Sequence, residues 1–228
     1  MQFRRFLLPV LVALPVLTVL LGLGTWQWQR LGWKTALLAE LAAAEQAPPV
    51  PLPATPQPFA RVIVRGRFDH GREVLLGAEV RGNRMGAHLL TPLLRPDAPP
   101  LLVDRGWVPV ERDVPLDRPE GEVAVTGYVR QADERSWLAA ADNPAARRFF
   151  TLDPEAIGQA LGLPRPAPFV LVALATPDSP PQALPEPARH LPRPNNPHLG
   201  YAITWYGLAA ALLGVLAVFL GRRWKESA

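Results

Sequence analysis

Four histidines are the side chains of this chain most able to hold a metal: His70, His88, His190 and His198. None of them falls into an HExxH pattern or another spacing typical of a metal site. The chain contains no cysteine, which excludes a disulfide framework, a CxxC zinc site, an iron–sulfur cluster and thiol-based copper transfer. A metal centre built from ligands close together in the sequence is therefore not predicted.

Motifs for covalent catalysis and for phosphate binding are also missing from the sequence. None of the three serines lies in a GxSxG motif, and no GxGxxG or GxxxxGK[ST] pattern is present. Asp104 and Arg105 stand inside an apolar strand-like run. They are better explained by a structural ion pair, or by a bend at Gly106, than by catalysis. The sequence predicts that this protein is not an enzyme.

His198 has the most informative surroundings of the four histidines. Asn196 is a favourable N-cap and Pro197 suits the first helical position, so we predict that His198 is the second residue of a helix. The positive end of the helix dipole disfavours an imidazolium. The neutral ring is the form that binds a metal or a haem iron, and Tyr201 and Trp205 share its helical face. The alternative is an interfacial residue that hydrogen-bonds lipid headgroups, and the residues alone leave both open.

The helix that begins near His198 is one of two long uncharged runs, residues 6–29 and 199–221. As helices they would be about 34–36 Å long, which is enough to cross a bilayer. The first run is too long for the apolar core of a signal peptide, and no A-x-A-like cleavage site follows it. We therefore predict two transmembrane helices that form a hairpin.

Charge at the ends of the runs predicts their orientation. Lysine and arginine exceed aspartate and glutamate by four, and the excess lies entirely beside the two runs. It comes from Arg4, Arg5, Arg222, Arg223 and Lys225, set against Glu226. A nucleic-acid-binding protein would instead collect positive charge on a folded face, so no nucleic acid partner is predicted. The positive-inside rule places residues 1–5 and 222–228 in the cytoplasm. The protein is then a multi-pass protein of the cell inner membrane with a periplasmic central domain.

That central segment divides by composition. Residues 30–58 form a helical extension followed by a proline-rich linker, and residues 176–198 form a second proline-rich linker. Between them, residues 59–175 carry short runs rich in valine, leucine and aromatic residues, separated by turn residues. These strand-like runs are residues 61–68, 73–80, 88–94, 101–110, 123–130, 148–152 and 169–173. With one short helix over residues 154–161, they predict an extracytoplasmic, mainly antiparallel β domain of the α+β class.

Glycines predict how the two spans pack. Four of them recur every seven residues on the helical face roughly opposite His198: Gly200, Gly207, Gly214 and Gly221. Small residues let helix backbones approach closely in a membrane. We therefore predict that this face packs against Gly22 and Gly24 of the first span.

Several motifs together resemble the surfeit locus protein family, in its bacterial form. They are LGTWQWQR at residues 23–30, RGRFD at 65–69, LVDRGWVP at 102–109, GYVR at 127–130, and NNPHLGYAITWYGLA at 195–209. The similarity runs from end to end, and the spacing of the motifs and the two-span layout agree with it. The family comprises assembly factors of cytochrome c oxidase.

The resemblance implies a chaperone of respiratory chain biogenesis that binds haem a transiently and assists its delivery into oxidase subunit I. It implies that His198 is the axial ligand of the haem iron, and we expect Tyr201 and Trp205 to contact the ring. Haem a synthase is a further candidate partner, besides the lipid bilayer. The alternative function is a membrane scaffold that stabilises oxidase assembly intermediates without binding haem.

Overall fold

A computed structural model describes residues 2–111, 114–137, 139–177 and 183–227 of the chain, and part of the predicted linker at 176–198 lies outside these ranges. Contacts divide the chain into two compact units. Met1–Glu40 and Arg193–Ala228 form one unit, and Leu41–Pro192 forms the other. The first unit is a pair of long helices, and the second is a β domain.

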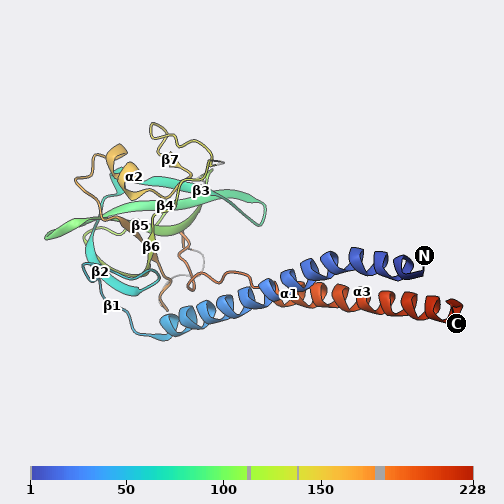
Figure 1. Cartoon of the computed structure of the whole chain (residues 1–228). Coiled ribbons are helices and arrows are strands. Elements are labelled where there is room, and N and C mark those ends of the chain that lie inside the picture. The colour runs from blue at the N-terminus through green and yellow to red at the C-terminus, as the bar shows by residue number, and fades with distance from the viewer. Residues whose placement is uncertain (1, 112–113, 138, 178–182, 228) are drawn as a thin grey trace. The chain divides into compact units, whose positions relative to one another are not determined.

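Helices α1 (Gln2–Gln46) and α3 (His198–Ser227) make up the first unit and lie side by side in opposite directions (Figure 1). Both are long and apolar enough to cross a membrane, over Leu7–Gln46 and His198–Lys225. Pro9 and Pro15 lie inside α1 without ending it, as is tolerated in membrane helices. The predicted helical hairpin is confirmed.

The two helices meet along a stripe of residues spaced alternately three and four apart. On α1 the less exposed residues include Val10, Ala13, Leu17, Leu20, Gly24, Gln27, Leu31 and Lys34. On α3 they are His198, Ala202, Trp205, Ala209, Leu212 and Leu216. This 3–4 spacing is the pattern of a left-handed helix pair, because it keeps one face of each helix turned toward its partner. We call these two stripes together the seam.

The predicted packing of the glycine face is wrong for α3. Gly200, Gly207 and Gly214 are exposed, and a Cβ added at any of them would meet no other atom within 4 Å. Gly24 of α1 does lie in the seam, but its close neighbour is the ring of Tyr206. The residues of α3 that permit close approach are alanines, since Ala202 and Ala209 are almost fully buried.

Strands of the second unit form one sheet that closes on itself. Its order is β1-β2-β6-β8-β5-β4-β3-β7, and β2 also pairs with β4, so that β2, β6, β8, β5 and β4 make a barrel (Figure 1). The bounds are β1 Val50–Pro51, β2 Arg61–Phe68, β3 Val74–Arg81, β4 Arg84–Arg95, β5 Ala98–Pro109, β6 Glu122–Gln131, β7 Arg148–Phe149 and β8 Phe169–Ala173. All pairings are antiparallel except β1–β2, β3–β7 and β5–β8. The predicted mainly antiparallel β domain is confirmed.

Alternation along the strands sends apolar side chains to opposite faces of the sheet, where they form separate clusters. Leu101, Val103 and Leu171 belong to the cluster inside the barrel, with Val62, Val64, Phe68, Leu93 and Val129. Their neighbours Leu102 and Val170 belong to a second cluster. Because successive residues of a strand face opposite sides, β5 and β8 are apolar on both faces.

Helix α2 (Pro154–Ala160) covers that second cluster with Ile157 and the following Leu161. The Asp153 side chain accepts hydrogen bonds from the backbone N–H groups of Glu155 and Ala156 and so caps the helix. A proline at the first turn and Gly162 after the last turn, with φ of 65°, complete the start and stop signals.

Candidate functional site

His198 is the first residue of α3, and its ring is turned toward α1. Its Nδ1 lies 2.7 Å from Oε1 of Gln27. At that distance the ring N–H donates a short hydrogen bond to the amide carbonyl. Neither partner is free in solvent, since Gln27 is only 9% exposed and His198 is half-buried.

The start of α3 differs by one residue from the prediction. The carbonyl of Pro197 accepts the first helical hydrogen bond, from the backbone N–H of Tyr201 at 3.4 Å. Pro197 is therefore the N-cap, and Asn196 does not cap the helix. The Asn196 side chain instead donates from Nδ2 to Oγ1 of Thr35 on α1, at 3.4 Å. Oδ1 of Asn196, the atom that would cap the helix, is buried and has no hydrogen-bond partner among the described residues.

The two aromatic residues expected beside His198 have different surroundings. Trp205 lies in the seam, two turns along α3, and is half-buried. Tyr201 lies one turn along and is 53% exposed, so most of its ring is turned away from α1. A third aromatic residue, Tyr206, packs on Gly24 and has its hydroxyl oxygen 3.1 Å from Oγ1 of Thr25.

Gln27 was not singled out from the sequence, although a signal for it exists. Five seam positions of α1 before it, from Val10 to Gly24, are apolar and spaced three and four apart. Gln27 is the next position in that series and the first polar one. An amide at a buried helix–helix position requires a hydrogen-bonding partner, and that partner is His198.

The free nitrogen of His198 fits one kind of metal group. Nδ1 is engaged by Gln27, and no described residue hydrogen-bonds Nε2. Among the described residues there is no group of three or more histidine, aspartate or glutamate side chains able to hold an ion. A bare zinc or copper ion needs three or four protein ligands. A single imidazole nitrogen instead suits a haem iron, which brings its own ring nitrogens and takes only axial ligands from the protein.

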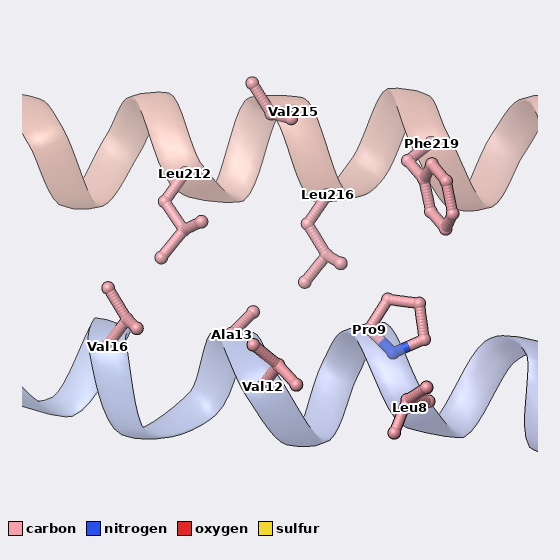
Figure 2. Close-up of a pocket in the computed structure, with 9 residues that line it drawn as sticks. All are labelled: Leu8, Pro9, Val12, Ala13, Val16, Leu212, Val215, Leu216 and Phe219. Atoms are coloured by element: carbon pink, nitrogen blue, oxygen red, sulfur yellow. The ribbon is translucent and has the colours of Figure 1, made fainter.

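A separate hollow lies between the two helices, further from His198. Its volume is about 450 Å³, and it is lined only by apolar residues (Figure 2). They are Leu8, Pro9, Val12, Ala13, Val16, Leu212, Val215, Leu216 and Phe219. With no donor or acceptor side chain in its walls, this hollow cannot hold a metal or an ionised group.

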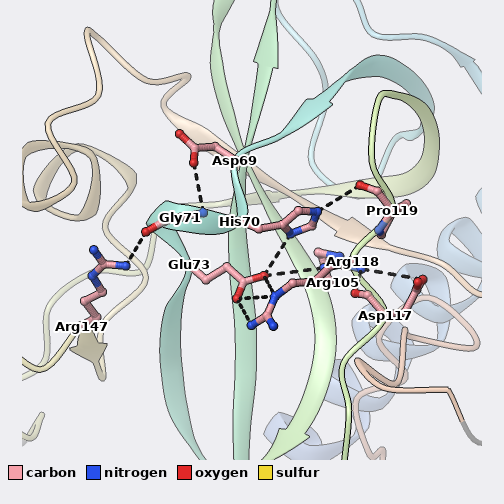
Figure 3. A network of polar contacts seen from close by, with 9 residues as sticks. All are labelled: Asp69, His70, Gly71, Glu73, Arg105, Asp117, Arg118, Pro119 and Arg147. Atoms are coloured by element: carbon pink, nitrogen blue, oxygen red, sulfur yellow. Dashed lines mark hydrogen bonds and ion pairs between the residues drawn. The ribbon is translucent and has the colours of Figure 1, made fainter.

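The β domain contains two charged clusters, and the first surrounds Glu73 (Figure 3). Glu73 accepts hydrogen bonds from Nη2 of Arg118 at 2.7 Å and Nδ1 of His70 at 3.1 Å. Burial raises the pKa of this carboxyl, but the hydrogen bonds from Arg118 and His70 outweigh burial and leave the pKa lowered. Arg105 lies 3.8 Å from the same carboxylate and donates to the Asp117 carbonyl at 2.6 Å.

The second cluster is centred on His88. Its Nδ1 lies 3.0 Å from Oδ1 of Asp104, and its Nε2 lies 3.1 Å from Oε2 of Glu79. The hydrogen bond to Asp104 is the main cause that raises the pKa of His88, and it outweighs burial, which lowers it. Arg81 also pairs with Glu79, at 2.8 Å. Asp104 and Arg105 therefore do not pair with each other: as neighbours on a strand they face opposite sides and join different clusters.

The charged groups of each cluster pair mainly with one another, although Nη1 of Arg105 has no hydrogen-bond partner among the described residues, and we interpret both clusters as structural. The molecule is thus defined by a pair of membrane-type helices with a single half-buried histidine, and by a closed β-barrel domain.

A sequence profile of the SURF1 family matches residues 14–210, and the chain belongs to this family. The match confirms the resemblance found in the motifs. The family consists of assembly factors that are not enzymes, in agreement with the prediction.

Individual relatives support the same assignment. The chain is 35% identical to Surfeit locus protein 1 of Homo sapiens over 231 residues, which cover 90% of this chain and 75% of the relative. It is 33% identical to Surfeit locus protein 1 of Mus musculus over 214 residues, covering 83% and 68%. It is also 32% identical over 123 residues to the cytochrome oxidase assembly protein SHY1 of Saccharomyces cerevisiae, covering 50% and 31%.

Proposed function

We propose that this protein is a membrane-anchored assembly factor of cytochrome c oxidase that binds haem a through His198 and assists its delivery into subunit I. Membership of the SURF1 family and the name of the yeast relative support the role in oxidase assembly. The observation that carries the haem-binding part is the geometry of His198. Its Nδ1 is held by Gln27, while Nε2 has no hydrogen-bond partner among the described residues.

The surroundings of His198 suit a large, poorly soluble ring. The histidine stands at the start of a helix able to cross a membrane, so a bound ring would lie where apolar and polar surroundings meet. Trp205 and Tyr201 are the aromatic side chains nearest to it along α3 and would contact the ring. Haem, when bound, supplies the iron that accepts the Nε2 lone pair. The protein's own residues bind and orient it and keep it from water.

The membrane topology belongs to the same proposal. Arg4 and Arg5 precede the first span, and Arg222, Arg223 and Lys225 follow the central part of the second. By the positive-inside rule both ends of the chain face the cytoplasm and the β domain faces the periplasm. His198 then lies at the periplasmic end of α3.

Absorbance spectra of the purified protein test the haem proposal. The full chain is purified from cells that make haem a and from cells that cannot, and its spectrum is normalised to protein amount. We expect a haem a spectrum only in protein from the cells that make haem a. The His198→Ala variant should lose this spectrum almost completely, while its amount in the membrane stays at the wild-type level. Trp205→Leu should lose less, because an aromatic contact contributes only about 0.5–1.5 kcal/mol.

His190→Ala is the matched control, since His190 is exposed and lies in the proline-rich segment after the barrel. A full haem spectrum in His198→Ala would contradict the proposal. The protein would then be better described as a scaffold for assembly intermediates.

A further inference from the structure

Gln27 is a buried polar residue in the middle of the apolar helix pair. It lies on α1, 171 residues before His198, and its side-chain oxygen is 2.7 Å from the histidine Nδ1. Around it the seam is formed by Gly24, Leu31 and Ala202. An unpaired amide at such a position would destabilise the helix pair, so the hydrogen bond with His198 holds both side chains in place.

The direction of this hydrogen bond determines the state of the ring. An amide oxygen can only accept, so the proton of the imidazole resides on Nδ1. Nε2 then carries the lone pair in the plane of the ring, on the side away from Gln27. Metal-binding histidines in proteins commonly donate their second ring N–H to such an acceptor, which fixes the tautomer and makes the ligating nitrogen a stronger electron donor.

We propose that Gln27 is the positioning residue of the haem site: it fixes the tautomer and orientation of His198 and tunes electron donation from Nε2 to the haem iron. This inference rests on the proposed function. It predicts that the acceptor strength at residue 27 controls the reduction potential of the bound haem. If Gln27 only joins the two helices, its substitution would change the amount of protein but would not change the reduction potential of the haem according to acceptor strength.

Two substitutions change the acceptor while keeping the size of the side chain. Gln27→Glu offers a stronger acceptor, which favours the oxidised iron, and Gln27→Met offers only the weak acceptor of a thioether sulfur. We expect the reduction potential of the purified haem-loaded protein to rise in the order Glu, Gln, Met, with matching shifts of the main absorption band. Gln29→Glu and Gln29→Met are the controls, because Gln29 is exposed on the same helix two residues away.

The outcomes separate this inference from the proposed function. Loss of haem in Gln27→Met at wild-type protein level, with binding kept in Gln27→Glu, would also support a positioning role. If Gln27→Met does not accumulate, a lower potential in Gln27→Glu than in Gln29→Glu still supports the inference. Equal potentials and equal spectra in Gln27→Glu, Gln29→Glu and the wild type would overturn it while leaving haem binding intact. Only a full spectrum in His198→Ala would overturn the proposed function itself.

Discussion

At the scale of single residues, His88 is held between two carboxylates in the wall of the barrel domain. Both ring nitrogens face carboxylate oxygens, of Asp104 and Glu79, and the pKa of His88 is raised mainly by the hydrogen bond to Asp104. A raised pKa in the folded state means that the stabilisation is complete below the unfolded value of about 6.5. It is lost as the pH rises through the folded pKa.

We therefore expect the barrel of the wild-type protein in detergent to unfold at a lower temperature as the pH is raised from 6 to 9. His88→Gln should be less stable at pH 6 and should show a flatter pH dependence, as measured by near-ultraviolet circular dichroism on heating. His190→Gln, which removes a histidine that faces no carboxylate of the residues that the structure describes, should keep the wild-type dependence. A steep dependence that survives in His88→Gln would show that another group is responsible.

Polar residues whose partners lie on another helix or strand could not be assigned a role from the sequence. The role proposed for His198 came from its neighbours and from the resemblance of its motif, and it stays a prediction. Gln27 and Glu79 could not be assigned in the same way, because their partners His198 and His88 are distant in the sequence or on another strand. Asp104 and Arg105 were predicted to form a structural ion pair or to mark a bend at Gly106. They do not pair with each other: Asp104 lies beside His88 and Arg105 beside Glu73, and these contacts depend on how the strands pair.

At the scale of elements, the seam shows which residues bring the two long helices together. Ala209 is 2% exposed and faces α1, whereas Gly207 is exposed and has open space around it. A large side chain at Ala209 would force the helices apart. At Gly207 it would point away from α1.

We expect Ala209→Leu to destabilise the helix pair by about 1–3 kcal/mol, the usual cost of overpacking. Gly207→Leu should be tolerated. The amount of full-length protein in membranes and the haem content of the oxidase measure the difference. Equal losses in both variants would mean that the glycine face is covered by another protein.

Elements were predicted well where a periodic pattern decides them, and poorly where spatial partners do. The strand-like runs at residues 61–68 and 169–173, bounded by turn residues, gave the bounds of β2 and β8 as the structure has them. The two-residue strand β1 has no pattern of its own and exists because it lies beside Val62 and Ile63. The glycine repeat predicted the wrong face of α3. Ala202 and Ala209 on the other face are also small, and they fit the 3–4 spacing of the seam.

At the scale of the whole molecule, orientation in the membrane is open to a direct test because the chain contains no cysteine. Ala145→Cys places a thiol at an exposed position of the β domain, and Trp224→Cys places one near the end of α3. In spheroplasts, a membrane-impermeant thiol reagent should label the first variant and should label the second only after the membrane is opened. The wild-type protein is the unlabelled control, and the reverse pattern would contradict the topology.

The barrel is closed unevenly, and this has a consequence for its motions. β2 and β6 pair through seven residue pairs, from Arg61–Tyr128 to Arg67–Glu122, whereas β2 and β4 pair only at Arg67–Leu94 and Phe68–Leu93. Local opening requires least free energy where the fewest backbone hydrogen bonds must break together. Native-state hydrogen exchange should therefore be faster for the amides of the β2–β4 junction than for those in the middle of β6. The sheet would then open briefly at this junction, while the longer pairing of β2 with β6 stays intact.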